Sequence, residues 1–222
     1  MNPTRRGILR TALGFGGIAA VHPIGPAWAS SLTETPRQTR GPFYPVSRPL
    51  DFDADLTLIQ GRSGRAQGRI VHVMGRVVDS RGRPIRGASV ELWQANANGR
   101  YAHPADLNPA PLDPYFQGFG MQTTDDEGQY RFKTIKPGAY PVNPRNPRAV
   151  RPPHIHFIVT DRDRRLVTQM YFPDEPANES DVIFGKLAVE ERRAATANLL
   201  TETADVEPDA LMARWDIVLT SG

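Results

Sequence analysis

Two histidines separated by a single residue, His154 and His156, are the strongest chemical feature of this sequence. In an extended strand, residues i and i+2 face the same side, so both imidazoles can converge on one metal ion. Ile155 and Phe157 would then face an apolar core on the other side, and Arg151 places a permanent cation nearby. The pattern also has a simpler explanation, a solvated or hydrogen-bonded pair of histidines on a strand face.

The lack of cysteine limits the kind of metal site that the chain can build. None of the 222 residues is a cysteine, which excludes disulfides, zinc ribbons, iron–sulfur clusters and thiol nucleophiles. Any metal must therefore be held by oxygen atoms and imidazole nitrogens. The available histidines are His22, His72, His103, His154 and His156.

A long loop predicted between residues 95 and 123 supplies most of the remaining candidate ligands. The sequence has no H-E-x-x-H motif, so ligands beyond the histidine pair must be carboxylates or phenolates. The candidates are Tyr101, His103, Asp106, Asp113 and Tyr115 in the loop, and Tyr140 in a Pro-Gly-Ala-Tyr-Pro turn. Composition and spacing do not choose among them.

Residues 1–29 have the three parts of a twin-arginine signal peptide. Arg5 and Arg6 precede a weakly apolar stretch at residues 11–21, and a small-x-small cleavage pattern ends at Ala29. The apolar stretch is too short and too rich in glycine to span a bilayer, which needs about 20 apolar residues. We therefore expect a periplasmic or secreted protein, exported already folded by the twin-arginine route, with no membrane anchoring after signal cleavage.

The charge of the chain is balanced once this leader is removed. The formal net charge of +3 includes Arg5, Arg6 and Arg10, and the leader contains no Asp or Glu, so 24 basic and 24 acidic residues remain. No basic stripe with interleaved aromatic residues occurs elsewhere in the sequence. The charge pattern therefore argues against nucleic-acid binding.

The rest of the chain divides into an arm and a β-rich domain. Residues 30–68 are rich in Pro, Arg, Gly and Asp without periodicity, which predicts an extended N-terminal arm. Residues 69–222 alternate apolar and polar positions in short runs, which predicts a β-sandwich domain with one short helix within residues 189–200. This domain contains the histidine pair, so it is the candidate catalytic domain. The predicted strands are residues 70–78, 88–94, 129–135, 154–160, 166–172 and 214–219. The fold class is thus all-β, a single prealbumin-like β-sandwich with long active-site loops.

Eight ordered sequence blocks connect this chain to a known family. They are residues 35–44 (TPRQTRGPFY), 87–96 (GASVELWQAN), 99–101 (GRY), 113–118 (DPYFQG), 124–130 (TDDEGQY), 135–141 (IKPGAYP), 151–157 (RPPHIHF) and 168–172 (TQMYF). Together they resemble the intradiol ring-cleavage dioxygenases, most closely the protocatechuate 3,4-dioxygenase branch. Because the blocks extend over most of the chain after the leader, the resemblance is highly specific.

The resemblance implies a non-haem Fe(III) site held by Tyr101, Tyr140, His154 and His156. Tyr101 and His156 would be equatorial ligands, and Tyr140 and His154 would be axial. Two phenolates are hard, anionic donors that favour a trivalent ion, and metal binding lowers the pKa of a phenol far below its free value of about 10.

The resemblance also implies catalytic roles for Tyr140, Arg151 and Gln169. Arg151 would stabilise carbanionic charge on the bound substrate, and Gln169 would support the site through hydrogen bonds. Tyr140 would leave the ion when an aromatic diol binds and would accept one of its protons. Reaction with O2 would then open the ring between the two hydroxyl-bearing carbons to a muconate-type diacid, with no organic cofactor.

Two positions depart from the protocatechuate branch. Val142 and Val150 stand where that branch has tryptophan. The resemblance implies that both positions border the substrate pocket, so it does not fix the ring substituent. The helical N-terminal dimerisation region of catechol-cleaving relatives is missing. A homo-oligomer is compatible with the sequence.

Two other functional classes remain open at this point. Segments 79–88 and 128–132 are typical of prealbumin-like modules that bind without catalysis, and a zinc or copper protein could use His154, His156 and His103. The four-residue ligand set distinguishes the dioxygenase from a binding module, because such a module has no reason to keep both tyrosines with the histidine pair. For His72 and His103 the simplest interpretation is a surface or packing role.

Overall fold

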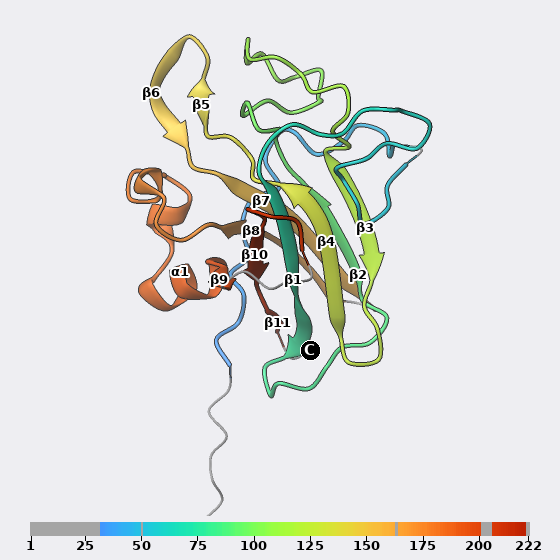
Figure 1. Ribbon diagram of the computed structural model, residues 1–222. Helices are drawn as coiled ribbons and strands as arrows, with labels where there is room; N and C mark the ends of the chain where they lie inside the picture. The colour runs from blue at the N-terminus through green and yellow to red at the C-terminus, as the bar shows by residue number, and fades with distance from the viewer. Residues whose placement is uncertain (1–31, 50, 163, 201–205, 221–222) are drawn as a thin grey trace, which may run out of the picture.

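The computed structural model describes residues 32–49, 51–162, 164–200 and 206–220 (Figure 1). The expected signal peptide at residues 1–29 lies outside the described residues. In the described part of the chain, no helix is long and apolar enough to cross a membrane.

The first sheet is built around β1 (Ile70–Asp79). β4 (Gln129–Ile135) pairs antiparallel with one side of β1. On the other side, β10 (Leu211–Arg214) pairs in parallel with the first half of β1, and β11 (Ile217–Leu219) pairs in parallel with its end. β9 (Asn198–Leu200) completes the sheet beside β10.

The second sheet is antiparallel and has the order β3-β2-β7-β8. Its strands are β3 (Phe119–Thr123), β2 (Ser89–Trp93), β7 (His154–Asp161) and β8 (Arg164–Tyr171). β2 and β7 are the inner strands, so side chains on them are covered by neighbours on both sides.

The main core lies between the two sheets and follows from the alternation of side chains along their strands. Phe132 of β4 and Phe157 of β7 are fully buried, with their ring centroids 6.5 Å apart. Val90 and Leu92 of β2 join this core, as their spacing predicts, whereas Trp93 belongs to a second cluster of buried residues. Two sheets packed face to face confirm the predicted β-sandwich.

Several short elements differ from the prediction. The expected loop at residues 95–123 ends in β3, and the turn around Tyr140 begins a hairpin of β5 (Tyr140–Asn143) and β6 (Asn146–Arg151). The single strand expected at residues 214–219 is split into β10 and β11. The split occurs at Trp215, whose N–H donates a hydrogen bond to the Met74 carbonyl. Gly75 allows β1 and the Trp215 backbone to approach this closely, because a Cβ at Gly75 would lie 1.9 Å from the Trp215 carbonyl oxygen.

The predicted short helix is present within residues 189–200. α1 (Val189–Ala195) begins where Glu191 accepts a hydrogen bond from the Ala188 N–H, and it follows two short 3-10 helices, η1 (Pro176–Asn178) and η2 (Phe184–Lys186). The chain leaves the helix at residue 196 because the Ala197 N–H bonds to the carbonyl of Tyr171, at the end of β8. β9, which the sequence analysis did not predict, then follows at the end of the same range.

Residues 32–49 and 51–68 run along both sheets. The Gln38 N–H donates to the Val167 carbonyl of β8, and the Leu56 N–H donates to the Lys133 carbonyl of β4. None of the described residues of this segment forms a helix or a strand longer than an isolated bridge.

Candidate active site

β7 presents His154 and His156 on the face of the second sheet that points away from the main core. Ile155 and Phe157 are fully buried in that core, as the strand pattern predicts. The two imidazoles are 2% and 3% exposed and lie 4.9 Å apart between ring centroids. They are therefore buried on the outer side of the sheet, beneath loops and the N-terminal segment.

Two tyrosines complete a closed ring of aromatic contacts with this pair. Tyr101 comes from the loop after β2, and Tyr140 is the first residue of β5. Centroid distances are 5.6 Å for Tyr101–Tyr140, 5.7 Å for Tyr140–His154 and 6.2 Å for Tyr101–His156. The structure thus brings together the four residues that the sequence resemblance selects.

Three polar atoms of this cluster are buried and have no hydrogen-bond partner among the residues that the structure describes. They are the Tyr101 hydroxyl, Nε2 of His154 and Nδ1 of His156. Nδ1 of His154 lies 2.7 Å from the Pro152 carbonyl, which can only accept, so this nitrogen carries the proton and Nε2 carries a lone pair. Unpaired buried polar groups are costly, and a bound cation would satisfy all three, so the residues fit a metal ion.

The protonation states of the four side chains suit a metal ion better than a hydrogen-bonded core. Burial, helped by the Arg151 charge, lowers the pKa of His154 to about 3, so its imidazole is neutral and can bind a metal. Burial likewise holds the pKa of His156 well below its ordinary value. Burial raises the pKa of Tyr101 and of Tyr140, so each phenol needs a strong electrostatic partner to ionise.

A glycine lets the two tyrosine-bearing segments meet. Gly99 precedes Tyr101 by two residues and has a φ of +75°, a conformation that favours glycine. A Cβ on Gly99 would lie 2.3 Å from the Ala139 carbonyl oxygen, immediately before Tyr140. This close approach positions the loop against the start of β5.

Aromatic side chains close the cluster on two sides. Trp93, opposite His156 in the β2–β7 register, stacks on its imidazole with centroids 4.7 Å apart and an interplanar angle of 12°. Phe43 of the N-terminal segment lies 4.8 Å from Tyr101 and 6.3 Å from Tyr140 between ring centroids. Trp93 is thus both a buried core residue and a neighbour of the candidate ligand.

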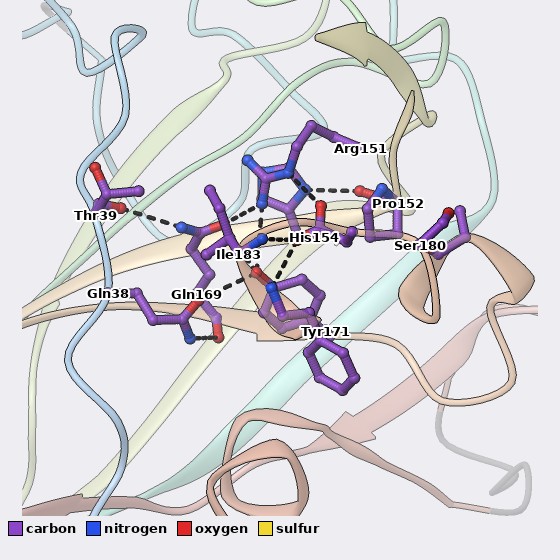
Figure 2. A network of polar contacts seen from close by, with 12 residues as sticks. Gln38, Thr39, Arg151, Pro152, His154, Gln169, Tyr171, Ser180 and Ile183 are labelled. Carbon is purple, nitrogen blue, oxygen red and sulfur yellow. Dashed lines mark hydrogen bonds and ion pairs between the residues drawn. The ribbon is translucent and has the colours of Figure 1, made fainter. Parts of the chain in front are cut away.

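Arg151 lies at the centre of a polar network beside His154 (Figure 2). Its Nη2 donates to Gln169 Oε1 at 2.6 Å and to the Tyr171 hydroxyl at 3.3 Å. The Gln169 Nε2 donates in turn to the Thr39 carbonyl, so one amide joins the guanidinium to the N-terminal segment. Burial alone would lower the pKa of Arg151, but Tyr140 and Asp181 outweigh it, so the pKa is raised and the side chain stays charged.

Asp181 is a member of this network that the sequence did not reveal. Its Oδ2 lies 2.5 Å from Arg151 Nε, and its side chain is 0% exposed. A single aspartate 30 residues after Arg151, outside any periodic pattern, gives no signal of such a pairing.

The other loop candidates have local structural roles. The Asp106 carboxylate accepts hydrogen bonds from the Tyr101 and Asn108 N–H groups, and His103 Nδ1 accepts one from Ala105. Asp113 accepts hydrogen bonds from residues 67 and 115. Among the residues that the structure describes, no three His, Asp or Glu side chains gather as a metal site, so the zinc or copper alternative with His103 finds no support in the arrangement.

A separate cavity of about 540 Å³ lies elsewhere on the molecule. Residues of β1, β4 and β10 line it, including Met74, Arg131 and Arg214, and none of the four clustered residues does. The chemistry therefore places the candidate active site at the histidine pair rather than at this cavity.

Comparisons with known proteins identify the family to which the chain belongs. A family model described as Dioxygenase matches residues 39–221. The protocatechuate 3,4-dioxygenase beta chain of Burkholderia cepacia is 44% identical over 190 residues, which are 85% of this chain and 80% of that protein. The hydroxyquinol 1,2-dioxygenase of Rhizobium sp. strain MTP-10005 is 32% identical over 181 residues, which are 76% of this chain and 56% of that protein.

A solved structure also places the chain among the dioxygenases. The dioxygenase domain of a carbohydrate-binding fusion protein from Streptomyces sp. SirexAA-E superimposes with a TM-score of 0.63 at 26% identity, covering 86% of this chain and 100% of that one. The chain therefore belongs to the dioxygenase family. Within that family it is an intradiol ring-cleavage dioxygenase near the protocatechuate branch, which confirms the resemblance seen in the sequence.

Proposed function

We propose that this protein uses a non-haem Fe(III) ion held by Tyr101, Tyr140, His154 and His156 to cleave catechol-type diols with O2 to muconate-type diacids. The observation that carries the proposal is the closed ring of contacts among these four side chains, in which three buried polar atoms have no hydrogen-bond partner. Two neutral imidazoles and two phenols that can ionise form a donor set suited to a hard trivalent cation. When bound, the ion would supply Lewis-acid activation of the diol.

The protein's own residues would manage the protons and charge of the substrate. Tyr140 is the most exposed of the four, at 9%, so it is the phenol that an incoming diol can reach first. Because burial raises the pKa of Tyr140, its oxygen would hold a proton taken from a substrate hydroxyl. Arg151, which faces Tyr140 across the β5–β6 hairpin, would stabilise negative charge that develops on the substrate ring.

The surrounding side chains would exclude water from the reacting ring. Phe43 lies against both tyrosines and Trp93 covers His156, so apolar surface faces the cluster on two sides. In such a low-dielectric site, the charge of Arg151 acts more strongly than it would in water.

The substrates named for the relatives define the range to test. Those relatives include protocatechuate, hydroxyquinol and catechol dioxygenases. Val142, 54% exposed on β5, and the half-buried Val150 on β6 lie on the hairpin that begins with Tyr140. Valine is smaller than the tryptophan of the protocatechuate branch at both positions, and we include substituted catechols in the proposed substrate class for this reason.

The proposal extends to the setting of the enzyme. The twin-arginine pattern in residues 1–29 supports export of the folded protein to the periplasm or beyond, with no membrane anchoring afterwards. The N-terminal segment would act as an arm that closes the site of a prealbumin-like sandwich. Because relatives include both alpha and beta chains of protocatechuate 3,4-dioxygenase, we also propose an oligomer, with a homo-oligomer as the simplest case.

Oxygen uptake by the iron-loaded protein tests the proposed function. Catechol, protocatechuate, hydroxyquinol and gallate are supplied in turn, and the product is analysed by mass spectrometry. We expect uptake with at least one diol and a product that carries both oxygen atoms of O2. His156→Ala should abolish uptake, whereas His72→Ala, a histidine on the other sheet, should retain it. Iron-loaded protein that consumes no O2 with any of the four would refute the proposal.

A further inference from the structure

Asp181 is a fully buried aspartate whose two carboxylate oxygens bind different partners. One oxygen, Oδ1, accepts hydrogen bonds from the N–H groups of Ile183 and Phe184, at 2.8 and 2.7 Å. The other, Oδ2, accepts from Arg151 Nε at 2.5 Å. The aspartate thus joins the turn before η2 to the end of β6, where the guanidinium lies.

The partners of Arg151 leave one edge of the guanidinium free. Nε is taken by Asp181, and Nη2 is shared between Gln169 and Tyr171. Nη1 makes no hydrogen bond with any residue that the structure describes. Because Arg151 is the cross-strand partner of Tyr140, this free edge belongs to a side chain that faces the candidate catalytic phenol.

We infer that Asp181 is a positioning residue of the active site: by fixing Nε of Arg151, it holds the guanidinium so that Nη1 remains available to the substrate. This inference rests on the proposed function, which gives Arg151 its role. Arg151 has a single charge-bearing partner within this network, because Gln169 and Tyr171 are neutral side chains. Without Asp181, the guanidinium would be held only at Nη2, by Gln169 and Tyr171, so it could tilt about that end and lose the alignment of Nη1.

The substitution Asp181→Asn separates this role from the turn that Asp181 also stabilises. An asparagine oxygen can still accept from Ile183 and Phe184, but its NH2 group then faces Arg151 Nε–H, which is also a donor. The variant therefore keeps the turn and loses the contact with Arg151. Asp181→Glu keeps the charge but displaces the carboxylate by one methylene, and it serves as a second variant should Asp181→Asn fail to fold.

Asp79 provides a matched control away from the site. It is also a buried aspartate whose Oδ1 accepts two backbone N–H groups, those of Arg81 and Arg83. Its Oδ2 accepts from Arg83 Nε at 2.6 Å. Asp79→Asn thus removes the same type of contact at the end of β1, with no link to the site.

The test compares wild type, Asp181→Asn, Asp181→Glu, Asp79→Asn, Arg151→Met and the double variant Arg151→Met/Asp181→Asn. Each protein is loaded with iron, and its iron content and visible spectrum are measured. Its kcat and KM are then determined with catechol or with another diol that the wild type prefers. We expect Asp181→Asn to retain iron and to lose about 10- to 100-fold in kcat, with a smaller change in KM. Its visible band should shift, because the cation beside Tyr140 has moved. Asp79→Asn should have the same kcat and the same visible band as the wild type.

The double variant shows whether Asp181 acts through Arg151. If it does, Arg151→Met/Asp181→Asn has the same kcat as Arg151→Met, because there is no guanidinium left to position. Equal kcat and band position in Asp181→Asn and Asp79→Asn would overturn the inference, as would losses that multiply in the double variant. A wild-type protein that binds iron but oxidises no diol instead overturns the proposed function itself.

Discussion

The imidazole of His156 lies flat against the indole of Trp93, with ring centroids 4.7 Å apart and planes inclined by 12°. The two residues face each other across neighbouring strands β2 and β7, so the sheet register itself creates the stack. Among the described residues, the buried indole Nε1 has no hydrogen-bond partner, so the contact of Trp93 with His156 is made by the face of the ring.

This stack predicts that Trp93 controls the affinity of the metal site. Trp93→Leu should lower iron affinity about 10-fold or more, because the imidazole loses the surface that fixes its plane, whereas Trp93→Phe should keep most of it. Iron titration followed by the visible band measures both. Trp215→Phe is the control: Trp215 is also buried but lies in the main core, so it should lose stability without losing iron affinity. Equal iron affinity in Trp93→Leu and wild type would contradict the role of the stack.

The close approach at Gly99 makes a second prediction. Gly99→Ala should weaken iron binding as well as stability, because a Cβ there would overlap the Ala139 carbonyl and displace Tyr140. Gly87→Ala separates this overlap from backbone strain, since Gly87 has the same φ of +75° but no atom within 4 Å of the added Cβ. Both variants should lose about 1–2 kcal/mol of stability from strain, and only Gly99→Ala should lose iron affinity. Thermal unfolding and iron titration distinguish the two effects. Equally strong iron binding in both variants would contradict the prediction that the contact between Gly99 and Ala139 positions Tyr140 for the metal.

Glu207 predicts a specific dependence of stability on pH. Its carboxylate accepts hydrogen bonds from Lys133 at 2.5 Å, His72 at 2.8 Å and Arg65 at 3.0 Å. The hydrogen bonds from Lys133 and His72 hold the pKa of Glu207 well below its ordinary value of 4.5. Because the folded-state pKa is lowered, the ionised group stabilises the protein above pH 4.5, and this contribution is lost as the pH falls through the folded-state pKa.

Glu207→Gln should therefore be less stable than wild type at pH 7, by about 1 kcal/mol after allowance for solvent screening at a partly exposed site. The difference should shrink as the pH falls below 4.5. Thermal unfolding midpoints at pH 7 and at progressively lower pH check this. Glu190→Gln, which breaks a pair that is exposed on both sides, should differ little from wild type at any pH. A difference for Glu207→Gln that grows on acidification would contradict the assigned pKa shift.

The sequence predicts the parts of this molecule that repeat a simple pattern. The alternation at residues 154–160 places Ile155 and Phe157 in the core and both histidines on the opposite face, as the structure shows. β1, β2, β4, β7 and β8 all fall within one or two residues of their predicted bounds. These strands are long enough for their alternation to be visible above chance.

The elements that the sequence missed depend on contacts between distant segments. β9 has three residues, all exposed, and it forms only because Ala197 bonds to Tyr171 and the chain then pairs with β10. The position of Asp181 depends on the path of the chain through η1 and η2, which no local pattern encodes. Family resemblance was needed to select Tyr101 and Tyr140, because a tyrosine in a loop has no spacing that marks it as a ligand.

The visible spectrum and metal content of the purified protein test the central claim most directly, namely that two phenolates and two imidazoles hold one ferric ion. We predict about one iron per chain and a reddish-brown colour from tyrosinate-to-iron charge transfer. Tyr140→Phe should bleach or greatly weaken this colour, whereas Tyr130→Phe, at a buried tyrosine bonded to the Trp215 carbonyl, should leave it intact. A colourless, zinc-loaded protein with full ring-cleaving activity would contradict the account.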